Sequence, residues 1–295
     1  MRVFLLLIIS FSCWGQKIHP FPAGVPDEPV QYTPSERVSK IPDVHYCDTL
    51  KLDVYSPAAP KNATALILIH GGGWTSGDKN QLAQMANRLA GAGYVCFVPQ
   101  YRLSGQAKYP AAAQDIQSVL DWVTENAKKY RINPHKIIAA GFSAGGHLAA
   151  LAGTTFHKPL YKNGLCGFKA QGKIAAVIDI DGILAFIHPE SGEGNDGKKL
   201  SAATQWFGYP KTYSTLGWEE ASPLNHVSEK TPPILFINSS VKRMHAGRED
   251  FNVILQKYGT YHEVHEFENA PHDFCLRKPW FDSTIAIMDS FIKRL

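Results

Sequence analysis

The sequence predicts an α/β fold in which helices flank a doubly wound, mostly parallel sheet. Short apolar runs typical of buried strands, such as ALILIH at residues 65–70, alternate with helical patterns along the chain. Two runs of alternating polarity, DVHYCD and LKLDVY, come before them and indicate an antiparallel hairpin at a sheet edge. With 295 residues, of which 44% are hydrophobic, the chain can bury the core of one domain.

The first 15 residues are predicted to be a secretory signal peptide. Arg2 gives a positive start, residues 3–11 form an apolar stretch too short to span a bilayer, and Gly15 is a small residue before the expected cut. Cys13 suggests a lipid anchor instead, but Ser10 stands where a lipobox normally has leucine. We therefore expect a periplasmic or secreted protein, with lipidation at Cys13 the less favoured alternative and no membrane span later in the chain.

Residues 16–42 are rich in proline and polar side chains and predict an extended N-terminal arm before a domain at 43–295. After the strand at 65–70, Asp78 and Gln81 suggest a capping box for a helix at 79–93, followed by a strand at 94–102 and an amphipathic helix within 109–130.

Further strands are expected at residues 136–140, 175–182, 233–240 and 262–270, with helices after residue 143, at 249–259 and from about 280 to 295. Between the strand that ends near Gly182 and the one that starts near Pro233 lies an insert of about 183–230. It is too long for a simple crossover, so we expect a cap-like excursion over the strand ends. Its aromatic residues favour a role in binding only modestly.

The charge of the chain bears on its partners, and its cysteines bear on possible disulfides. The net charge is +4 and the basic residues are scattered, which argues against a nucleic-acid partner. Cys47, Cys96, Cys166 and Cys275 remain after the signal peptide, and export permits disulfides among them. Four cysteines allow three pairings, between which the sequence does not choose.

The segment GFSAGG at residues 141–146 carries the strongest chemical signal. It places Ser143 in a Gly-x-Ser-x-Gly pattern between a short apolar strand and a helix, the context of a nucleophile elbow. His70-Gly71-Gly72-Gly73-Trp74 follows an earlier strand directly. Glycines there let the backbone amides of Gly72 and Gly73 approach a substrate oxygen, together with the amide of Ala144, as an oxyanion hole.

These motifs, together with QYRLS at 100–104 and YPAAAQDI at 109–116, resemble the α/β-hydrolase esterases of the hormone-sensitive-lipase and feruloyl/acetyl-xylan-esterase type. The resemblance covers the chain from about Val44 onward. It implies that Ser143 is the nucleophile, that the amides of Gly72, Gly73 and Ala144 hold the oxyanion, and that no metal or cofactor is needed.

The resemblance also places the catalytic base in the loop after the last strand, where the chain reads APHDF at 270–274. His272 matches the family's histidine, whereas Asp273 departs from the glycine that usually follows it. His262 and His265 are expected on opposite faces of a strand, so they do not form a metal pair. His147, on the helix after Ser143, is interpreted as a packing histidine.

The acid of the triad is less clear. Most relatives have an aspartate shortly after the penultimate strand, where residues 238–243 read NSSVKR and contain no carboxylate. Asp181 ends the preceding strand and is preferred, because some lipases of this superfamily supply their acid from that position. Asp250 and Glu249 are the alternatives, although both are also explained as favourable charges in the first turn of a helix.

Together these observations predict an exported serine esterase that removes acetyl or feruloyl-type groups from polysaccharide or oligosaccharide. An acyltransferase, or an amidase or formamidase, with the same catalytic residues is the alternative, and a non-catalytic binding module is disfavoured because Ser143 and His272 are both present. A basic cluster suggests recognition of an acidic group such as a uronate, or equally a solvated loop; it comprises Lys242, Arg243, His245 and Arg248. The oligomeric state is left open.

Overall fold

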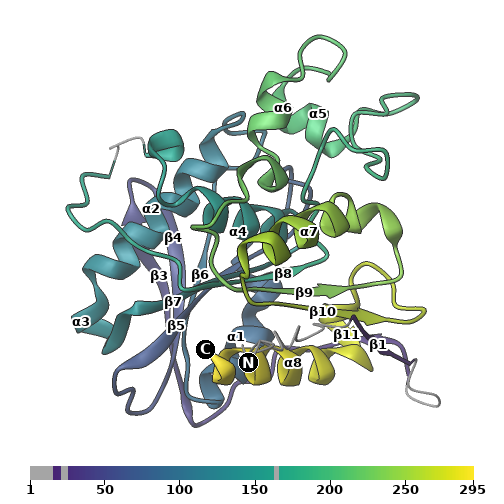
Figure 1. The fold of residues 1–295 in the computed structure, drawn as a ribbon. Helices are drawn as coiled ribbons and strands as arrows, with labels where there is room; N and C mark the ends of the chain where they lie inside the picture. Colours follow the sequence, from purple (N-terminus) through teal and green to yellow (C-terminus); the bar gives the residue numbers. More distant parts are fainter. Residues whose placement is uncertain (1–15, 21–25, 163–165) are drawn as a thin grey trace, which may run out of the picture.

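The computed structural model describes residues 16–20, 26–162 and 166–295. The predicted signal peptide and Cys13 therefore lie outside the described residues. A nine-stranded sheet forms the centre, in the order β1-β10-β9-β8-β7-β5-β6-β4-β3 (Figure 1). Its strands are β1 (Lys17–His19), β3 (Val38–Cys47), β4 (Leu50–Pro57), β5 (Ala63–Ile69), β6 (Val95–Pro99), β7 (Ile132–Phe142), β8 (Ala176–Ile180), β9 (Ile234–Asn238) and β10 (His262–Phe267). The strands β2 (Glu28–Pro29) and β11 (Arg277–Lys278) pair separately.

The helices are α1 (Ala83–Gly91), α2 (Ala111–Glu125), α3 (Ala127–Tyr130), α4 (Ala144–Thr155), α5 (Ala202–Phe207), α6 (Leu216–Glu220), α7 (Arg248–Tyr258) and α8 (Trp280–Arg294). Short 3-10 turns are η1 (Lys79–Leu82), η2 (Pro159–Tyr161), η3 (Pro223–His226), η4 (Lys242–His245) and η5 (Phe274–Leu276).

The sheet is mostly parallel, and the predicted fold class is confirmed. All neighbours from β1 through β6 in the sheet order are parallel, whereas β4 pairs antiparallel with both β6 and β3. The predicted edge hairpin is thus β3–β4. The outer strand β3 is irregular: its register against β4 shifts between Ile41 and Val44 and again between His45 and Cys47.

Two apolar layers cover the sheet, one on each face. Helices α1 and α8 lie on one face, with Met85 and Phe291 in the core between them and the strands. Helices α2, α4 and α7 lie on the other, where Leu148 and Phe251 are buried (Figure 1). Because side chains alternate along a strand, the buried strands β5, β8 and β9 supply apolar side chains to both layers.

The N-terminal segment is attached along the domain. β1 extends the sheet next to β10, and the His19 and His265 rings share a hydrogen bond of 2.8 Å between Nε2 and Nδ1. β2 pairs with β11, and β3 already begins at Val38. The boundary expected between residues 42 and 43 therefore falls inside a strand of the sheet.

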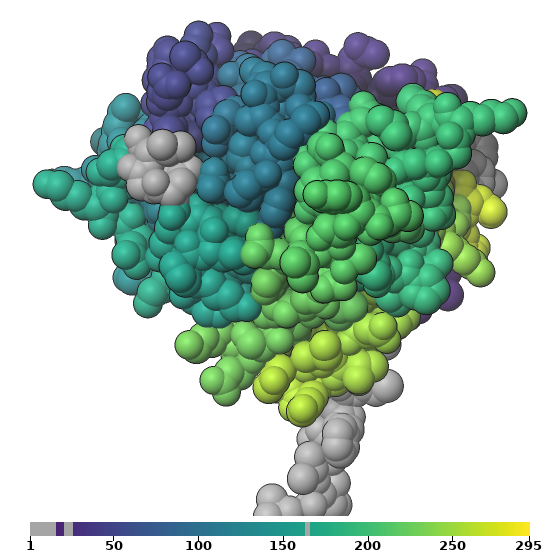
Figure 2. Space-filling model, turned by 90° about the horizontal axis from the view of Figure 1, so that it is seen from above, coloured from purple at the N-terminus to yellow at the C-terminus, as the bar shows by residue number. Residues whose placement is uncertain are grey.

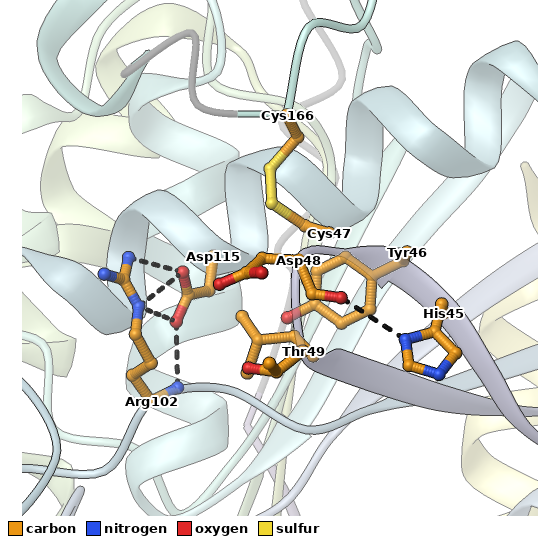
Figure 3. Close-up of a pocket in the computed structure, with 9 residues that line it drawn as sticks. His45, Tyr46, Cys47, Asp48, Thr49, Arg102, Asp115 and Cys166 are labelled. Atoms are coloured by element: carbon orange, nitrogen blue, oxygen red, sulfur yellow. Dashed lines mark hydrogen bonds and ion pairs between the residues drawn. A yellow bond between two sulfur atoms is a disulfide. The ribbon is translucent and has the colours of Figure 1, made fainter.

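One disulfide joins segments that are far apart in the sequence. Cys47, at the end of β3, is bonded to Cys166, whereas Cys96 and Cys275 are free and buried. Figure 3 shows a pocket beside this disulfide, at whose other side the Arg102 guanidinium forms a 2.6 Å ion pair with Asp115. This pair links the loop after β6 to α2, so the QYRLS and YPAAAQDI motifs hold each other in place.

The capping box expected at Asp78 and Gln81 is only half correct. The Asp78 carboxylate accepts a hydrogen bond from the Asn80 amide at 2.7 Å and so caps the turn η1. Gln81 does not reach back to Asp78; its Oε1 instead accepts a 2.7 Å hydrogen bond from the amide of Gly71. Gln81 therefore supports the glycine loop that follows β5.

No helix within residues 16–20, 26–162 and 166–295 has the length and apolar character that crossing a membrane requires.

Candidate active site

Ser143 lies at the sharp turn between β7 and α4. Its backbone has φ 56° and ψ −121°, a conformation that few non-glycine residues adopt. Glycine is needed on both sides. A Cβ on Gly141 would collide with the carbonyl of Gly145, and a Cβ on Gly145 would collide with the carbonyl of Ile69. The sequence pattern thus reflects how closely β5, β7 and α4 approach one another, and the strained turn lifts Ser143 to the N-terminus of a helix.

A continuous hydrogen-bonded chain runs from Ser143 through His272 to Asp181. His272 Nε2 lies 2.9 Å from Ser143 Oγ, and His272 Nδ1 lies 2.9 Å from Asp181 Oδ2. A carboxylate accepts from Nδ1–H, which leaves Nε2 as the acceptor for the serine hydroxyl. The His272 side chain is 30% exposed, whereas Asp181 is fully buried beneath it.

Asp181 follows β8 with φ 51°, and the strand next to it holds its carboxylate. The Ser239 amide donates to Asp181 Oδ1 at 2.8 Å, and Asn238 Nδ2 donates to the same oxygen at 3.4 Å. These donors come from the end of β9, the position at which the sequence lacks a carboxylate. The segment in which the sequence lacks a carboxylate thus supplies hydrogen-bond donors to the carboxylate that directly follows β8.

The two alternative acids point elsewhere. Asp250 is largely solvent-exposed and lies 3.3 Å from His188 Nε2. Glu249 forms an ion pair of 2.6 Å with Arg248. Among the contacts of the described residues, neither carboxylate reaches His272.

A second carboxyl, Asp179, lies two residues before Asp181 on β8. It is completely buried, accepts a 2.8 Å hydrogen bond from the Gly182 amide through Oδ1, and has no partner for Oδ2 among the described residues. Burial raises the pKa of Asp179 well above its usual range, and the neighbouring charge of Asp181 raises it further. The buried site thus favours the neutral form of this carboxyl.

The predicted oxyanion donors line the same pocket as Ser143 and His272. Gly72 and Gly73 have φ values of 119° and 58°, which favour glycine, and Ala144 is the first residue of α4. The Gly72 carbonyl accepts hydrogen bonds from the amides of Thr75 and Ser76, both at 3.1 Å, which close the loop. The pocket has a volume of about 480 Å³, and its lining also includes Gln81, Ile183, Glu193, Ala202, Arg243, Met244, Asp273 and Leu276.

His147 is a packing histidine, as the sequence predicts. Its Nδ1 accepts from Trp74 Nε1 at 3.2 Å, and its Nε2 donates to the Ala221 carbonyl at 2.8 Å. Burial lowers the pKa of His147 to about 4, so the ring is neutral at ordinary pH. The His147 side chain thus connects helix α4, the glycine loop after β5 and the insert.

The insert contributes to the pocket through different residues from those its composition suggests. Trp206 and Trp218 are fully buried and stack in an aromatic core with Phe207 and Trp74 instead of facing the pocket. Figure 2 shows the insert in green on the face of the molecule that is seen from above. The insert lines the pocket with Ile183, Glu193 and Ala202.

The basic cluster does not act as one group. Lys242 is exposed, Arg243 lines the pocket, and His245 and Arg248 are buried on the far side of Asp181 from His272. Gln81 and Glu193 also line the pocket, although no sequence motif marks either of them as a site residue.

Comparison with known proteins agrees with this architecture. A family model described as BD-FAE matches residues 52–244. The "Probable carboxylic ester hydrolase LipM" of Mycobacterium tuberculosis is 29% identical over 197 residues, which cover 66% of this chain and 43% of LipM. An arylesterase of Saccharolobus solfataricus is 31% identical over 138 residues, 46% of this chain and 43% of the relative. The chain spans about half the length of the curated relatives it matches first.

Solved structures show the same fold. A truncated carbohydrate esterase from gut microbiota aligns with a TM-score of 0.75 and 23% identity, covering 88% of this chain and 99% of that one. The apo form of esterase 2 from Thermogutta terrifontis aligns with a TM-score of 0.69 and 23% identity over 90% and 97% of the two chains.

Proposed function

This chain belongs to the BD-FAE family, and we propose that it is a serine carboxylic ester hydrolase with Ser143 as nucleophile, His272 as base and Asp181 as acid. The observation that carries this proposal is the unbroken chain of two 2.9 Å contacts from Ser143 through His272 to Asp181. The amides of Gly72, Gly73 and Ala144 form the oxyanion hole.

The reaction begins when Ser143 Oγ attacks the ester carbonyl and its proton moves to His272 Nε2. The carbonyl oxygen becomes negative and is stabilised by the backbone amides at the N-terminus of α4 and in the glycine loop. The buried Asp181 carboxylate holds the imidazole through Nδ1–H and stabilises the imidazolium. His272 then gives the proton to the leaving alcohol, and the acyl group stays bonded to Ser143 Oγ. A water molecule attacks this acyl group while His272 takes its proton, and His272 returns the proton to Ser143 as the acid is released.

We propose that the substrates are acetyl or feruloyl-type esters of polysaccharide or oligosaccharide. A pocket of about 480 Å³ falls within the size range of small-molecule sites. The side chains of Gln81, Glu193 and Arg243 offer it polar groups that can bind sugar hydroxyls. One similar solved structure is described as a carbohydrate esterase and another as a bifunctional GH43-CE, which supports the same substrate class.

Arg243 extends this proposal to acidic sugars such as uronates. Its side chain is about half exposed, and its ion pair with Glu193 is 3.9 Å long, beyond hydrogen-bond distance. A guanidinium with free donors suits a substrate carboxylate. An Arg243→Met variant should lose activity on acetylated pectin more than on acetylated xylan, and equal losses on both would remove Arg243 from this role.

We also propose that the protein is exported. The Cys47–Cys166 disulfide supports this, because such bonds persist in oxidising compartments and are rare in the cytosol. The apolar N-terminal stretch with Arg2 at its start supports the same conclusion. Detection of the mature chain in the periplasm or medium, by mass spectrometry of its N-terminus, tests both the export and the cut after Gly15.

A fluorophosphonate probe tests the catalytic assignment directly. Wild type should be labelled at Ser143, and Ser143→Ala should not be labelled. Asp181→Asn should lower kcat by about 10⁴-fold on nitrophenyl acetate, because the imidazole loses the carboxylate that orients it and stabilises its charge. Asp250→Asn, which changes an exposed carboxylate on α7, should retain activity.

Absence of labelling in the wild type would refute the hydrolase proposal, and an active Asp181→Asn variant would refute the choice of acid. A panel of acetylated xylan, acetylated pectin, feruloylated sugars and short nitrophenyl esters would identify the acyl group and the sugar. Product analysis with and without added sugar would reveal transfer in place of hydrolysis.

A further inference from the structure

A buried arginine lies behind the proposed triad acid, where the catalytic reaction has no direct use for it. Arg248 is the first residue of α7, and its side chain is only 7% exposed. Its guanidinium forms ion pairs with Glu249 at 2.6 Å and Glu266 at 3.3 Å. These carboxylates balance its charge and offset part of the cost of burying a cation.

The remaining contact of this guanidinium leads to the triad. Arg248 Nη1 donates to Asn238 Oδ1 at 2.8 Å, and Asn238 Nδ2 donates to Asp181 Oδ1 at 3.4 Å. Asn238 is itself buried at the end of β9. The Asn238 side-chain amide therefore connects the Arg248 guanidinium with the Asp181 carboxylate, which is hydrogen-bonded to His272.

The chemistry of the two side chains fixes which way this amide faces. A guanidinium has only N–H donors, so Asn238 must turn its oxygen toward Arg248. The amide nitrogen then faces Asp181, where a carboxylate accepts its hydrogen bond. If the amide were reversed, its oxygen would meet the carboxylate and its nitrogen would meet the guanidinium, and both contacts would be repulsive.

The neighbouring histidine does not compete for the same oxygen. His245 Nε2 lies 3.8 Å from Asp181 Oδ1 and has no hydrogen-bond partner among the described residues. Burial lowers the pKa of His245, and the charge of Arg248 lowers it further. Asp181 Oδ1 is thus held by neutral donors, the Ser239 amide and the Asn238 side chain, while Oδ2 is left to His272.

We propose that Arg248 is a positioning residue that acts through Asn238 to hold the Asp181 carboxylate against His272. This inference rests on the proposed function, because it assigns a role to Arg248 only if Asp181 is the acid. Arg248 then has a different role from the other members of the basic cluster. Its replacement should change the turnover number and not substrate binding.

A double-mutant cycle tests the proposal, with Arg248→Met, Asn238→Ala and the double variant assayed on nitrophenyl acetate. Each single variant should lower kcat about tenfold or more, with KM changed less than about twofold. The double variant should be no slower than the slower single variant, because Arg248 has no route to Asp181 once the Asn238 amide is gone. Arg248→Lys, which keeps a side chain with donors only, should recover most of the loss.

Lys257→Met, which removes an exposed basic residue at the other end of α7, serves as the control and should leave kcat unchanged. Thermal melts monitored by circular dichroism establish that each variant is folded. If Arg248→Met does not fold, Arg248→Gln takes its place in the cycle, because its side chain is neutral and shorter, and an amide that both donates and accepts no longer fixes the orientation of Asn238.

Losses that multiply in the double variant, or an unchanged kcat in Arg248→Met, would overturn the inference. An effect on KM alone would overturn it too, since it would place Arg248 in substrate binding. These results are separable from failure of the proposed function: an inactive Asp181→Asn variant with a fully active Arg248→Met variant removes only the role of Arg248, whereas an active Asp181→Asn variant removes the acid itself.

Discussion

The replacement His147→Gln should make the protein more resistant to acid than the wild type. His147 Nδ1 accepts from Trp74 Nε1, and His147 Nε2 donates to the Ala221 carbonyl. A glutamine can accept and donate in the same two directions but does not titrate. The substitution therefore keeps the connection between α4, the glycine loop and the insert while it removes a proton-binding site.

The size of the effect follows from the pKa of His147. Burial lowers this pKa from 6.5 to about 4 in the folded protein. Between pH 6.5 and 4 the unfolded chain binds a proton that the folded chain does not, so wild-type stability falls as the pH falls. At 1.36 kcal/mol per pKa unit, the contribution of His147 that is present above pH 6.5 and lost by pH 4 is about 3 kcal/mol.

Urea unfolding followed by tryptophan fluorescence, at several values between pH 7.5 and pH 4, measures this directly. As the pH falls from 7.5 to 4, the free energy of unfolding of His147→Gln minus that of wild type should rise by about 3 kcal/mol. Other groups that titrate there are common to both proteins and cancel in the difference. A difference that stays constant with pH would show that His147 is not held neutral by burial, and would refute the reasoning.

Three further outcomes are expected. Gly145→Ala should abolish fluorophosphonate labelling and lower the melting temperature, because the added Cβ would collide with the Ile69 carbonyl. Asp179→Asn should keep its activity on nitrophenyl acetate. The raised pKa of Asp179 makes wild-type stability fall as the pH rises above about 4, so in urea unfolding the stability of this variant relative to wild type should increase as the pH rises from that value. Replacing Cys47 and Cys166 by serine should lower the free energy of unfolding by roughly 2–5 kcal/mol in the same assay, and reduction of the wild type should do likewise.

The strands and the turn at Ser143 could be predicted because local sequence determines them, whereas His272 and Asp181 are candidates through the resemblance to α/β-hydrolase esterases. Each strand is a short apolar run, and Ser143 stands between such a run and a helix with the two glycines that the turn needs. The resemblance favours Asp181 over Asp250 and Glu249, because residues 238–243 lack the carboxylate that most relatives have there and some lipases supply their acid from the end of the preceding strand. β8 and β7 are neighbours, so their carboxyl ends meet at one edge of the sheet.

Contacts between distant segments could not be predicted in this way. The pairing of Cys47 with Cys166 joins residues 119 positions apart, and composition does not choose among three pairings. Gln81 has the spacing of a capping box, but the end of β5 brings Gly71 close enough to take its hydrogen bond instead. The burial of Arg248 depends on how α7 packs behind β8 and β9, which no local pattern records.

The two edges of the sheet bear on how the protein behaves at high concentration. Exposed edge strands offer unpaired amides and carbonyls to other chains, and proteins resist such association by keeping edges short, irregular or charged. β1 has only three residues. β3 is longer, but Lys40, Pro42 and its two register shifts interrupt the row of hydrogen-bonding groups that a second copy would need. A protein that is exported as proposed above, beyond the reach of cytosolic chaperones, would gain from described edges that are short or irregular in this way.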